Sequence, residues 1–181
     1  MPIMADPLNG IPRVDPTSKP TMMRRAVSRV LATKAGSTFH RMFMAPLDTR
    51  LIHLTRGRVH LAKGTFPLVQ LRTTGAKSGI QRDVTLVYFT DGGDVILIAS
   101  NYGQVKHPSW YYNLLKNSRC ELFADGRSDS GGSFVARPTK GADHDRLFAL
   151  MERYSPNFTN YAANTNGIRA IPVLRLTPEG H

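Results

Sequence analysis

Runs of apolar residues in the middle and C-terminal parts of the chain predict a series of β-strands. The apolar side chains either alternate with polar ones or form short continuous runs bounded by turn residues. Asp91-Gly92-Gly93-Asp94 separates two such runs, and a glycine pair between strands is typical of a tight hairpin. The predicted strands cover about residues 67–73, 82–90, 94–100, 119–125, 132–138 and 171–176.

Apolar residues at helical spacing predict helices on both sides of these strands. Met22, Met23, Val27 and Val30 share one face of a helix over residues 21–40, whose other face is basic. Further helices are predicted at about 46–55, 107–116 and 141–153, and the aromatic-rich stretch 154–161 fits a loop or a broken helix.

The order of these elements favours an antiparallel sheet. Most strands follow one another directly, and the alternating βαβ units of a doubly wound parallel sheet are missing. We therefore expect a mainly β protein with helices (an α+β fold), in which about six antiparallel strands form a barrel and helices pack outside it. Residues 1–20 are expected to be a disordered leader, 21–40 a basic amphipathic N-terminal helix, and 41–181 the barrel domain.

The charge of the chain indicates an acidic partner. The formal net charge is +11 at pH 7, and the pI is about 10.3. Nucleic acid, an anionic membrane surface and a polyanionic small molecule fit such a charge, but no nucleic-acid motif is present, so nucleic acid is not expected. The helix over 21–40 fits either a surface helix packed on the domain or an arm in peripheral contact with a membrane or a polyanion.

Cysteine usage and segment lengths indicate the compartment. Cys120 is the single cysteine, which excludes an internal disulfide framework, and its place in a predicted strand favours a small core residue. No secretory signal is present, and no apolar run reaches the roughly 20 residues that span a bilayer. A cytoplasmic protein is expected, membrane-associated only if the helix over 21–40 makes that contact.

The stretch 75–82 is the strongest candidate binding element, and we call it the basic loop. It contains Gly75, Gly79, Lys77, Ser78 and Arg82, a combination that lets backbone and cations approach an anion. The spacing of a Walker loop and of a dinucleotide fingerprint is absent. The alternative is a plain β-turn with solvated charges.

Two further motifs follow the third predicted strand. Ser100-Asn101-Tyr102-Gly103 places polar groups at a strand end, as in many ligand sites, although an ordinary turn has the same composition. Trp110 and Asn113 share one helix face and could both reach one ligand, or Trp110 could be a core residue. No metal site is expected at His107, and His144 between two aspartates fits a solvated helix start.

Together these motifs resemble the deazaflavin-dependent nitroreductase family of actinobacteria. The resemblance covers about residues 45–178. It rests on Leu71-Arg72-Thr73-Thr74-Gly75-Ala76-Lys77-Ser78-Gly79 with Arg82, on Ala99-Ser100-Asn101-Tyr102-Gly103, on His107-Pro108-Ser109-Trp110-Tyr111-Tyr112-Asn113-Leu114, and on Tyr154, Pro156, Tyr161 and Ile171-Pro172-Val173.

The resemblance implies a split β-barrel and an enzyme that uses reduced coenzyme F420, a strongly anionic deazaflavin, to reduce a quinone, an enone or a nitroaromatic. It implies Ser100, Tyr154 and Tyr161 as catalytic candidates, and Tyr154, Phe158 and Tyr161 as the substrate pocket. The residues implied for coenzyme binding are Ala76, Lys77, Ser78, Arg82, Asp83, Val84, Thr85, Leu86, Val87, Ile98, Ala99, Ser100, Asn101, Ser109, Trp110 and Asn113.

The chain departs from the family pattern at several positions, and other functions stay open. Ala76 stands where the family often has Arg, Thr85 where it often has Pro, and Phe158 where some members have Tyr. The alternatives are a non-enzymatic split barrel that binds a lipid or small ligand, and a relative that uses FMN or haem. The protein is expected to be a monomer or a homodimer.

Overall fold

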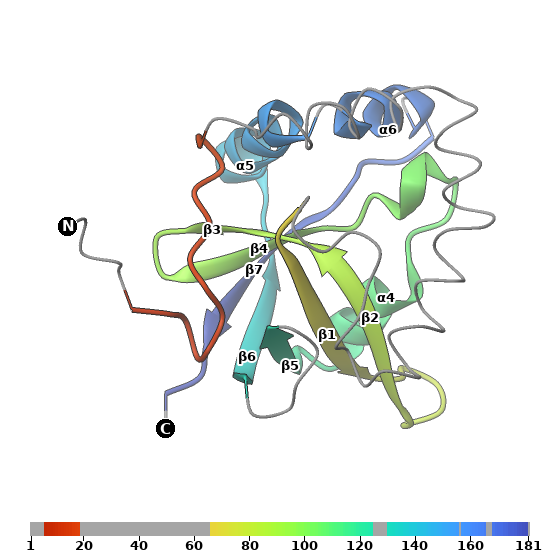
Figure 1. Ribbon diagram of the computed structural model, residues 1–181. Coiled ribbons are helices and arrows are strands. Elements are labelled where there is room, and N and C mark those ends of the chain that lie inside the picture. The colour runs from red at the N-terminus through yellow and green to blue at the C-terminus, as the bar shows by residue number, and fades with distance from the viewer. Residues whose placement is uncertain (1–5, 19–65, 125–129, 156, 166–167, 181) are drawn as a thin grey trace.

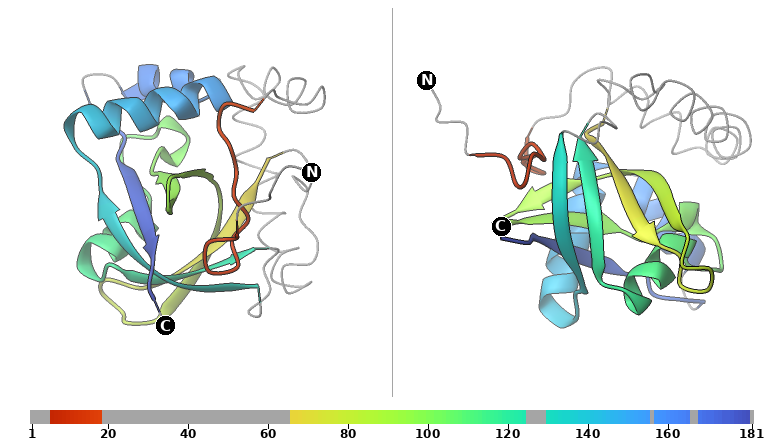
Figure 2. Two further views of the ribbon diagram at one scale, coloured as in Figure 1. Left: turned by 90° about the vertical axis from the view of Figure 1, so that its left-hand side faces the viewer. Right: turned by 90° about the horizontal axis from the view of Figure 1, so that it is seen from below.

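The computed structural model describes residues 6–18, 66–124, 130–155, 157–165 and 168–180. These residues form a seven-stranded antiparallel sheet in the order β2-β1-β5-β6-β7-β4-β3. The sheet curls into a half-barrel (Figures 1 and 2). The strands are β1 (Leu68–Thr74), β2 (Gln81–Val87), β3 (Phe89–Asp91), β4 (Asp94–Ile98), β5 (Arg119–Ala124), β6 (Gly131–Pro138) and β7 (Val173–Pro178).

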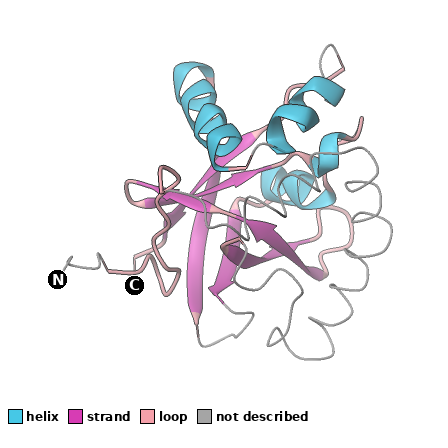
Figure 3. Ribbon diagram, turned by 45° about the horizontal axis from the view of Figure 1, so that its top comes forward, coloured by secondary structure: helices cyan, strands magenta, loops and turns pink. Residues whose placement is uncertain are grey.

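Helices pack outside this sheet, as predicted. The 3-10 turn η2 (Asn101–Gly103) and helix α4 (Ser109–Lys116) follow β4, and α5 (Gly141–Tyr154) and α6 (Asn157–Thr165) lie between β6 and β7 in the sequence. Figure 3 shows α5 and α6 beside each other on one side of the strands. The aromatic-rich stretch thus belongs to the end of α5 and the start of α6, which corresponds to the broken helix among the two predicted alternatives.

The sheet is buried on both faces where the sequence is continuously apolar. On β4, Val95 and Leu97 join an interior cluster with Leu71 and other strand residues. Ile96 and Ile98 of the same strand join a second cluster, which contains residues of α5 such as Leu147. Successive side chains of a strand point to opposite faces, so a strand between two apolar layers needs apolar residues at every position.

One predicted strand, 82–90, is wrong as a single element. The chain divides at Tyr88 into β2, which pairs with β1, and β3, which pairs with β4 at the far edge of the sheet. The Tyr88 N–H donates to the Pro67 carbonyl at 3.3 Å, and its hydroxyl donates to the Pro12 carbonyl at 3.0 Å. These long-range contacts hold the bend and raise the strand number from about six to seven.

The expected disordered leader is wrong for residues 6–18. Ile11 is 0% exposed, and it joins the interior cluster together with Leu8. The Asn9 amide donates to the Ser133 and Glu179 carbonyls at 3.0 and 3.1 Å, and the Val14 N–H donates to the Thr90 hydroxyl at 2.9 Å. A few apolar residues with long-range partners are therefore enough to order this proline-rich segment.

The predicted helices over 21–40 and 46–55 lie outside the described residues. Within the described part of the chain, no helix is both long and apolar enough to cross a membrane.

An ion-pair network attaches α5 to the edge of the sheet. Arg175 on β7 contacts Asp91 and Asp143 at 2.7 Å each, and Asp94 at 3.1 Å. Arg146 on α5 also contacts Asp91 at 2.7 Å, and the two guanidinium groups lower the Asp91 pKa to about 2. The network fixes α5 across the β3–β4 hairpin, and with it the start of α6.

Candidate functional site

The basic loop is a closed turn that extends from the end of the β1–β2 hairpin. The Gly75 N–H donates to the Ile80 carbonyl and the Gly79 N–H to the Gly75 carbonyl, both at 2.9 Å. Gly79 has a φ of +67°, a left-handed conformation that glycine adopts without steric cost. The turn leaves Lys77 and Ser78 exposed at its tip.

Asn113 on α4 holds this loop from inside. Its side chain is 8% exposed. The side-chain oxygen accepts the Ala76 N–H at 2.9 Å, and the side-chain nitrogen donates to the Thr73 hydroxyl at 3.0 Å. Asn113 therefore fixes the backbone that carries Lys77 and Ser78.

The remaining polar groups of the loop fit an anion. Within the described residues, the backbone N–H groups of Lys77 and Ser78 make no hydrogen bond, and the Lys77 ammonium group makes no ion pair. Arg82 pairs in register with the buried Thr73 at the base of the loop, and its own side chain is exposed. Two cations and free backbone donors beside a fixed turn are what a phosphate or carboxylate needs.

The residues predicted on β2 divide between the two faces of the sheet. Val84 and Leu86 pack against the interior cluster, whereas Val87 packs against the second cluster. Asp83 forms a bidentate ion pair with Arg72 at 2.8 and 3.0 Å. Because strand side chains alternate, those of residues 83, 85 and 87 lie on one face of β2 and those of 84 and 86 on the other.

Ser100 lies at the end of β4 with a hydroxyl available for a ligand. Its side chain is among the buried polar groups, at 9% exposed, and the hydroxyl has no hydrogen-bond partner within the described residues. Buried polar groups nearly always have a partner, so an orphaned hydroxyl indicates a ligand or water. Ala99 beside it is fully buried in the interior cluster.

The turn after Ser100 has an uncommon backbone. Asn101 and Tyr102 have φ values of 48° and 55°, which few residues other than glycine adopt. The Asn101 amide donates to the Lys106 carbonyl at 2.8 Å, which closes the loop. Gly103 lies directly against the backbone of Tyr161, where a Cβ atom would come within 3.1 Å of the Tyr161 Cα.

Aromatic side chains from α5 and α6 gather beside this loop. The Tyr161 ring packs edge-on to Phe158 and to Tyr102, with centroid distances of 5.4 and 6.2 Å. Tyr154 and Phe158 are buried in the second cluster, to which Ile98 also belongs. Burial, with a smaller effect of Tyr102, raises the pKa of Tyr161 to about 12, so its hydroxyl keeps its proton at neutral pH.

The structure assigns a packing position to several other predicted residues. Trp110 is buried in the interior cluster, which is the core interpretation that the sequence left open. Ser109 is exposed at the start of α4. Cys120 is buried as predicted, and burial raises the pKa of its thiol to about 12.

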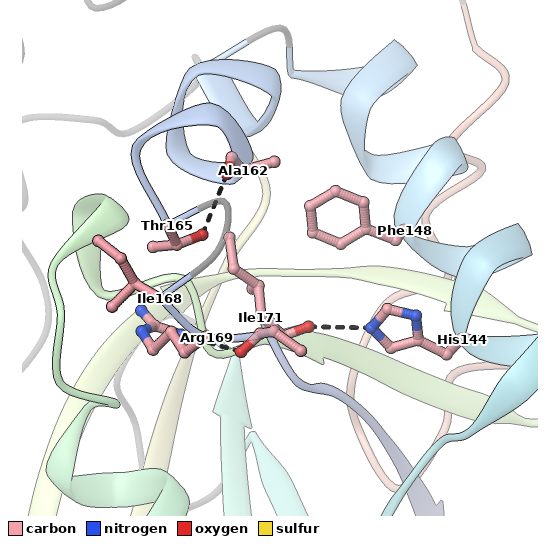
Figure 4. A pocket seen from close by; sticks show the side chains of 8 residues that line it. His144, Phe148, Ala162, Thr165, Ile168, Arg169 and Ile171 are labelled. Carbon is pink, nitrogen blue, oxygen red and sulfur yellow. Dashed lines mark hydrogen bonds between the residues drawn. The ribbon is translucent and has the colours of Figure 1, made fainter.

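His144 lies in the first turn of α5, as predicted, but its side chain is partly buried rather than fully solvated. Its ring stacks on Phe148, with a centroid distance of 6.0 Å, and one ring nitrogen lies 3.0 Å from the Ile171 carbonyl. Both residues line a cavity of about 460 Å³ between α5, α6 and residues 168–171 (Figure 4). None of the residues predicted for the site lines this cavity, but Arg169, which does, also contacts the Ser100 carbonyl.

Sequence reasoning missed Arg169, which lies between α6 and β7. Its guanidinium contacts the backbone of the turn that contains Ser100, as well as His107. A lone arginine before a strand carries no sequence signal, because its partners lie more than 60 residues away.

Comparison with known proteins gives the family. The model of one protein family, described as F420H(2)-dependent quinone reductase, matches residues 47–178. The chain belongs to this family. It is therefore an oxidoreductase that uses the reduced deazaflavin coenzyme F420, which confirms the predicted enzyme class and cofactor.

Individual relatives agree with the assignment. An F420H(2)-dependent quinone reductase of Mycobacterium tuberculosis is 36% identical over 127 residues, which are 68% of this chain and 82% of that protein. A solved F420-H2 dependent reductase has a TM-score of 0.52 and 31% identity, and the match covers 61% of this chain and 93% of the other. These relatives confirm the split-barrel fold.

Another solved structure is described as a domain-swapped dimer. It has a TM-score of 0.54 and 28% identity, and the match covers 72% of this chain and 96% of that chain.

Proposed function

We propose that this protein reduces a quinone, and that it holds F420 between the basic loop and Ser100. The observation that carries the proposal is the pair of available polar sites at the two ends of α4. Asn113 connects the helix to the basic loop, and His107, just before the helix, lies next to the Arg169 guanidinium that also contacts the Ser100 carbonyl. The rise from Ser109, the first residue of α4, to Asn113 is about 6 Å at 1.5 Å per residue, and His107 lies beyond it in the extended segment before the helix, a separation that suits an elongated ligand.

The basic loop would hold the phosphate and the start of the acidic tail. Lys77 and Arg82 supply charge, and the backbone N–H groups of Lys77 and Ser78 supply directed donors. Ala76 would act through the shape of the turn, because its N–H is already bonded to the Asn113 side-chain oxygen.

The deazaflavin ring would lie at the end of β4. Ile98, Ser100 and Asn101 would line it from β4 and the turn, and Thr85 and Val87 would do so from the outward face of β2. When bound, the reduced deazaflavin supplies the hydride. The chain's own contribution is to orient the ring, to exclude water with Tyr154 and Phe158, and to offer the Ser100 hydroxyl as a hydrogen-bond partner at the reactive edge.

A quinone fits the aromatic side of the site. Phe158 and Tyr161 offer ring faces and edges to a flat, electron-poor ring. The protonated Tyr161 hydroxyl can donate a hydrogen bond to a quinone oxygen, where negative charge develops as hydride arrives. One hydride and one proton from solvent convert the quinone to a hydroquinone.

The test is a fluorescence titration of the full chain with F420, followed by quinone reduction with F420H2. Removal of one charge-assisted hydrogen bond costs about 1.5–3 kcal/mol. The double variant Lys77→Met/Arg82→Met should therefore lose about 100-fold or more in F420 affinity. The charge-matched control is Lys140→Met/Arg153→Met, which removes one lysine and one arginine from exposed positions outside the basic loop. Equal affinities of the double variant and the control would exclude the basic loop as the anion site.

A peripheral membrane contact through the basic residues of 21–40 is a further part of the proposal. It would bring the enzyme to quinones dissolved in lipid. Co-sedimentation of the full chain with vesicles of about 30% anionic lipid tests it, because charge reversal at Arg24, Arg25 and Arg29 should abolish an electrostatic contact. Equal sedimentation of both proteins would contradict it.

A homodimer is also proposed, supported by the related structure described as a domain-swapped dimer. Light scattering on the full chain should give about twice the chain mass of 20.1 kDa. A mass of one chain over the whole concentration range would contradict the dimer.

A further inference from the structure

The Arg169 guanidinium holds the 99–107 loop through both of its ends. It donates to the Ser100 carbonyl at 2.6 Å and to the Gln104 carbonyl at 2.8 Å. It also lies 3.0 Å from His107 Nδ1, with longer contacts of 3.4 Å to the Ala99 and Ala170 carbonyls. One side chain therefore joins the end of β4, the turn after it and the start of α4.

Arg169 has no carboxylate among its described contacts. Burial lowers its pKa, and no salt bridge of the described residues includes it. Arg146 and Arg175, by contrast, each pair with aspartates. A partly buried guanidinium that donates to several backbone carbonyls orients the backbone, because its planar group holds the acceptors in fixed positions relative to one another.

The 99–107 loop needs such external support. It contains the left-handed Asn101 and Tyr102, and a non-glycine residue in that conformation costs free energy unless its surroundings impose it. The loop's own backbone hydrogen bonds are Gly103 N–H to the Ser100 carbonyl and Gln104 N–H to the Asn101 carbonyl, both at 3.0 Å. Arg169 binds the carbonyls on either side of this strained pair.

The contact with His107 extends the effect to α4. Since arginine only donates, His107 Nδ1 must accept, so the imidazole is neutral and carries its proton on Nε2. The same histidine packs against the ring of Tyr111 with a centroid distance of 5.1 Å. Arg169 thus fixes the start of the helix whose Asn113 holds the basic loop.

We infer that Arg169 is a positioning residue, which holds the 99–107 loop so that the Ser100 hydroxyl meets the reactive edge of the coenzyme ring. The inference rests on the proposed placement of the ring at Ser100. Arg169 itself does not need to touch coenzyme or substrate, because all of its nitrogen atoms are engaged with the protein.

The first experiment needs no coenzyme. Amide hydrogen exchange of the full chain is measured for the wild type, Arg169→Met, Arg169→Lys and the charge-matched control Arg153→Met. Exchange at Gly103 and Gln104 should rise at least tenfold in Arg169→Met and less in Arg169→Lys, while Arg153→Met stays at the wild-type rate. Unchanged exchange in Arg169→Met would overturn the inference.

The second experiment measures F420 affinity and steady-state kinetics of the same variants at matched folded fraction. Arg169→Met should lower kcat at saturating F420H2 at least tenfold and change F420 affinity much less, because Lys77 and Arg82 still bind the anionic part. Millimolar guanidinium should restore part of kcat in Arg169→Met but not in Ser100→Ala. A wild-type kcat in Arg169→Met would overturn the inference.

The two proposals fail in different ways. If the wild type binds no F420, both the proposed function and the role of Arg169 toward the ring are overturned. Hydrogen exchange then tests only whether Arg169 holds the loop. If the Lys77→Met/Arg82→Met variant loses affinity but Arg169→Met turns over normally, the proposed function stands and the positioning role is overturned.

Discussion

At the scale of single residues, the site depends on which polar groups the fold leaves unsatisfied. The Ser100 hydroxyl is buried without a partner in the described residues, whereas the equally buried Asn113 has both ends of its amide bonded. The first arrangement suits a group that meets a ligand, and the second suits a group that shapes the backbone. Residue type alone does not distinguish these two roles.

Ser100→Ala should lower turnover by about fivefold without abolishing it, since the loss of one hydrogen bond to a neutral partner costs about 1 kcal/mol. The hydride chemistry belongs to the coenzyme, so no single side chain is essential for it. Single-turnover measurement of the hydride-transfer rate checks this expectation. A complete loss of transfer in a folded Ser100→Ala variant would contradict it.

His107 and His144 should titrate in opposite directions from 6.5. Burial, and then the Arg169 charge, lowers the His107 pKa. Although burial is the largest influence on His144 and favours the neutral ring, the Asp145 carboxylate and the Ile171 carbonyl together raise its pKa. NMR titration of the ring protons, assigned with His107→Gln and His144→Gln, should place His107 below 6.5 and His144 above it.

The two histidines therefore give stability opposite dependences on pH. The His107 contribution is full above its unfolded pKa and is lost as pH falls toward its lower folded pKa. The His144 contribution is full below its unfolded pKa and is lost as pH rises through its higher folded pKa. The unfolding free energy should be measured between pH 5 and 8 for the wild type, His107→Gln and His144→Gln. Relative to the wild type, its slope against pH should change in opposite directions in the two variants, and equal changes would contradict the assignment.

At the scale of elements, α4 connects the two halves of the site. It begins just after His107, which contacts Arg169, and one of its inner residues is Asn113, which fixes the basic loop. Trp110 and Leu114 anchor the helix in the interior cluster. The helix is thus a rigid spacer, and its packing sets the distance between the anion site and the ring site.

Asn113→Ala should weaken F420 binding about tenfold although Asn113 acts from behind the loop. The substitution leaves the Ala76 N–H and the Thr73 hydroxyl without partners, which costs about 1–3 kcal/mol and loosens the turn. Fluorescence titration checks the affinity. Asn117→Ala is the matched control, because Asn117 is exposed at the end of α4 and accepts only the Arg119 N–H. Equal affinities of the two variants would exclude this role.

At the scale of the whole molecule, the N-terminal segment crosses half of the sheet. Residues 6–18 lie between the edge strand β3, where Val14 bonds to Thr90, and the central strand β6, where Asn9 bonds to Ser133. Ile11 fills the interior between them. Figure 2 shows this segment running beside the strands.

Ile11→Ala should destabilise the protein by about 2–5 kcal/mol, because it removes buried methylenes from a packed interior. Ile80→Ala is the control, since Ile80 is 58% exposed and its loss should cost less than about 0.5 kcal/mol. Urea unfolding of both variants measures the difference. Equal midpoints would mean that residues 6–18 do not support the barrel.

The sequence alone determined the features that depend on the spacing of residues close together in the chain. Strand period, the Asp91–Asp94 hairpin, the basic loop and the motifs around Ser100 and Trp110 are short-range patterns. They predicted an antiparallel barrel and an anion-binding loop, and their resemblance to a known family implied the split barrel and the coenzyme. These features persist because an alternating strand must bury one set of its side chains, and because an anion requires cations and free N–H groups nearby.

Only the tertiary structure decided which partner each residue meets. The break at Tyr88, the order of residues 6–18 and the contacts of Arg169 depend on pairs that lie far apart in the sequence, up to 170 residues for Asn9 and Glu179. The ion pair between Asp83 and Arg72 of the neighbouring strand is likewise set by the fold, whereas the place of Asp83 beside the ring stays a prediction. These contacts follow from the packing of the whole chain, because a polar side chain can bond only to groups that the fold brings within hydrogen-bond distance.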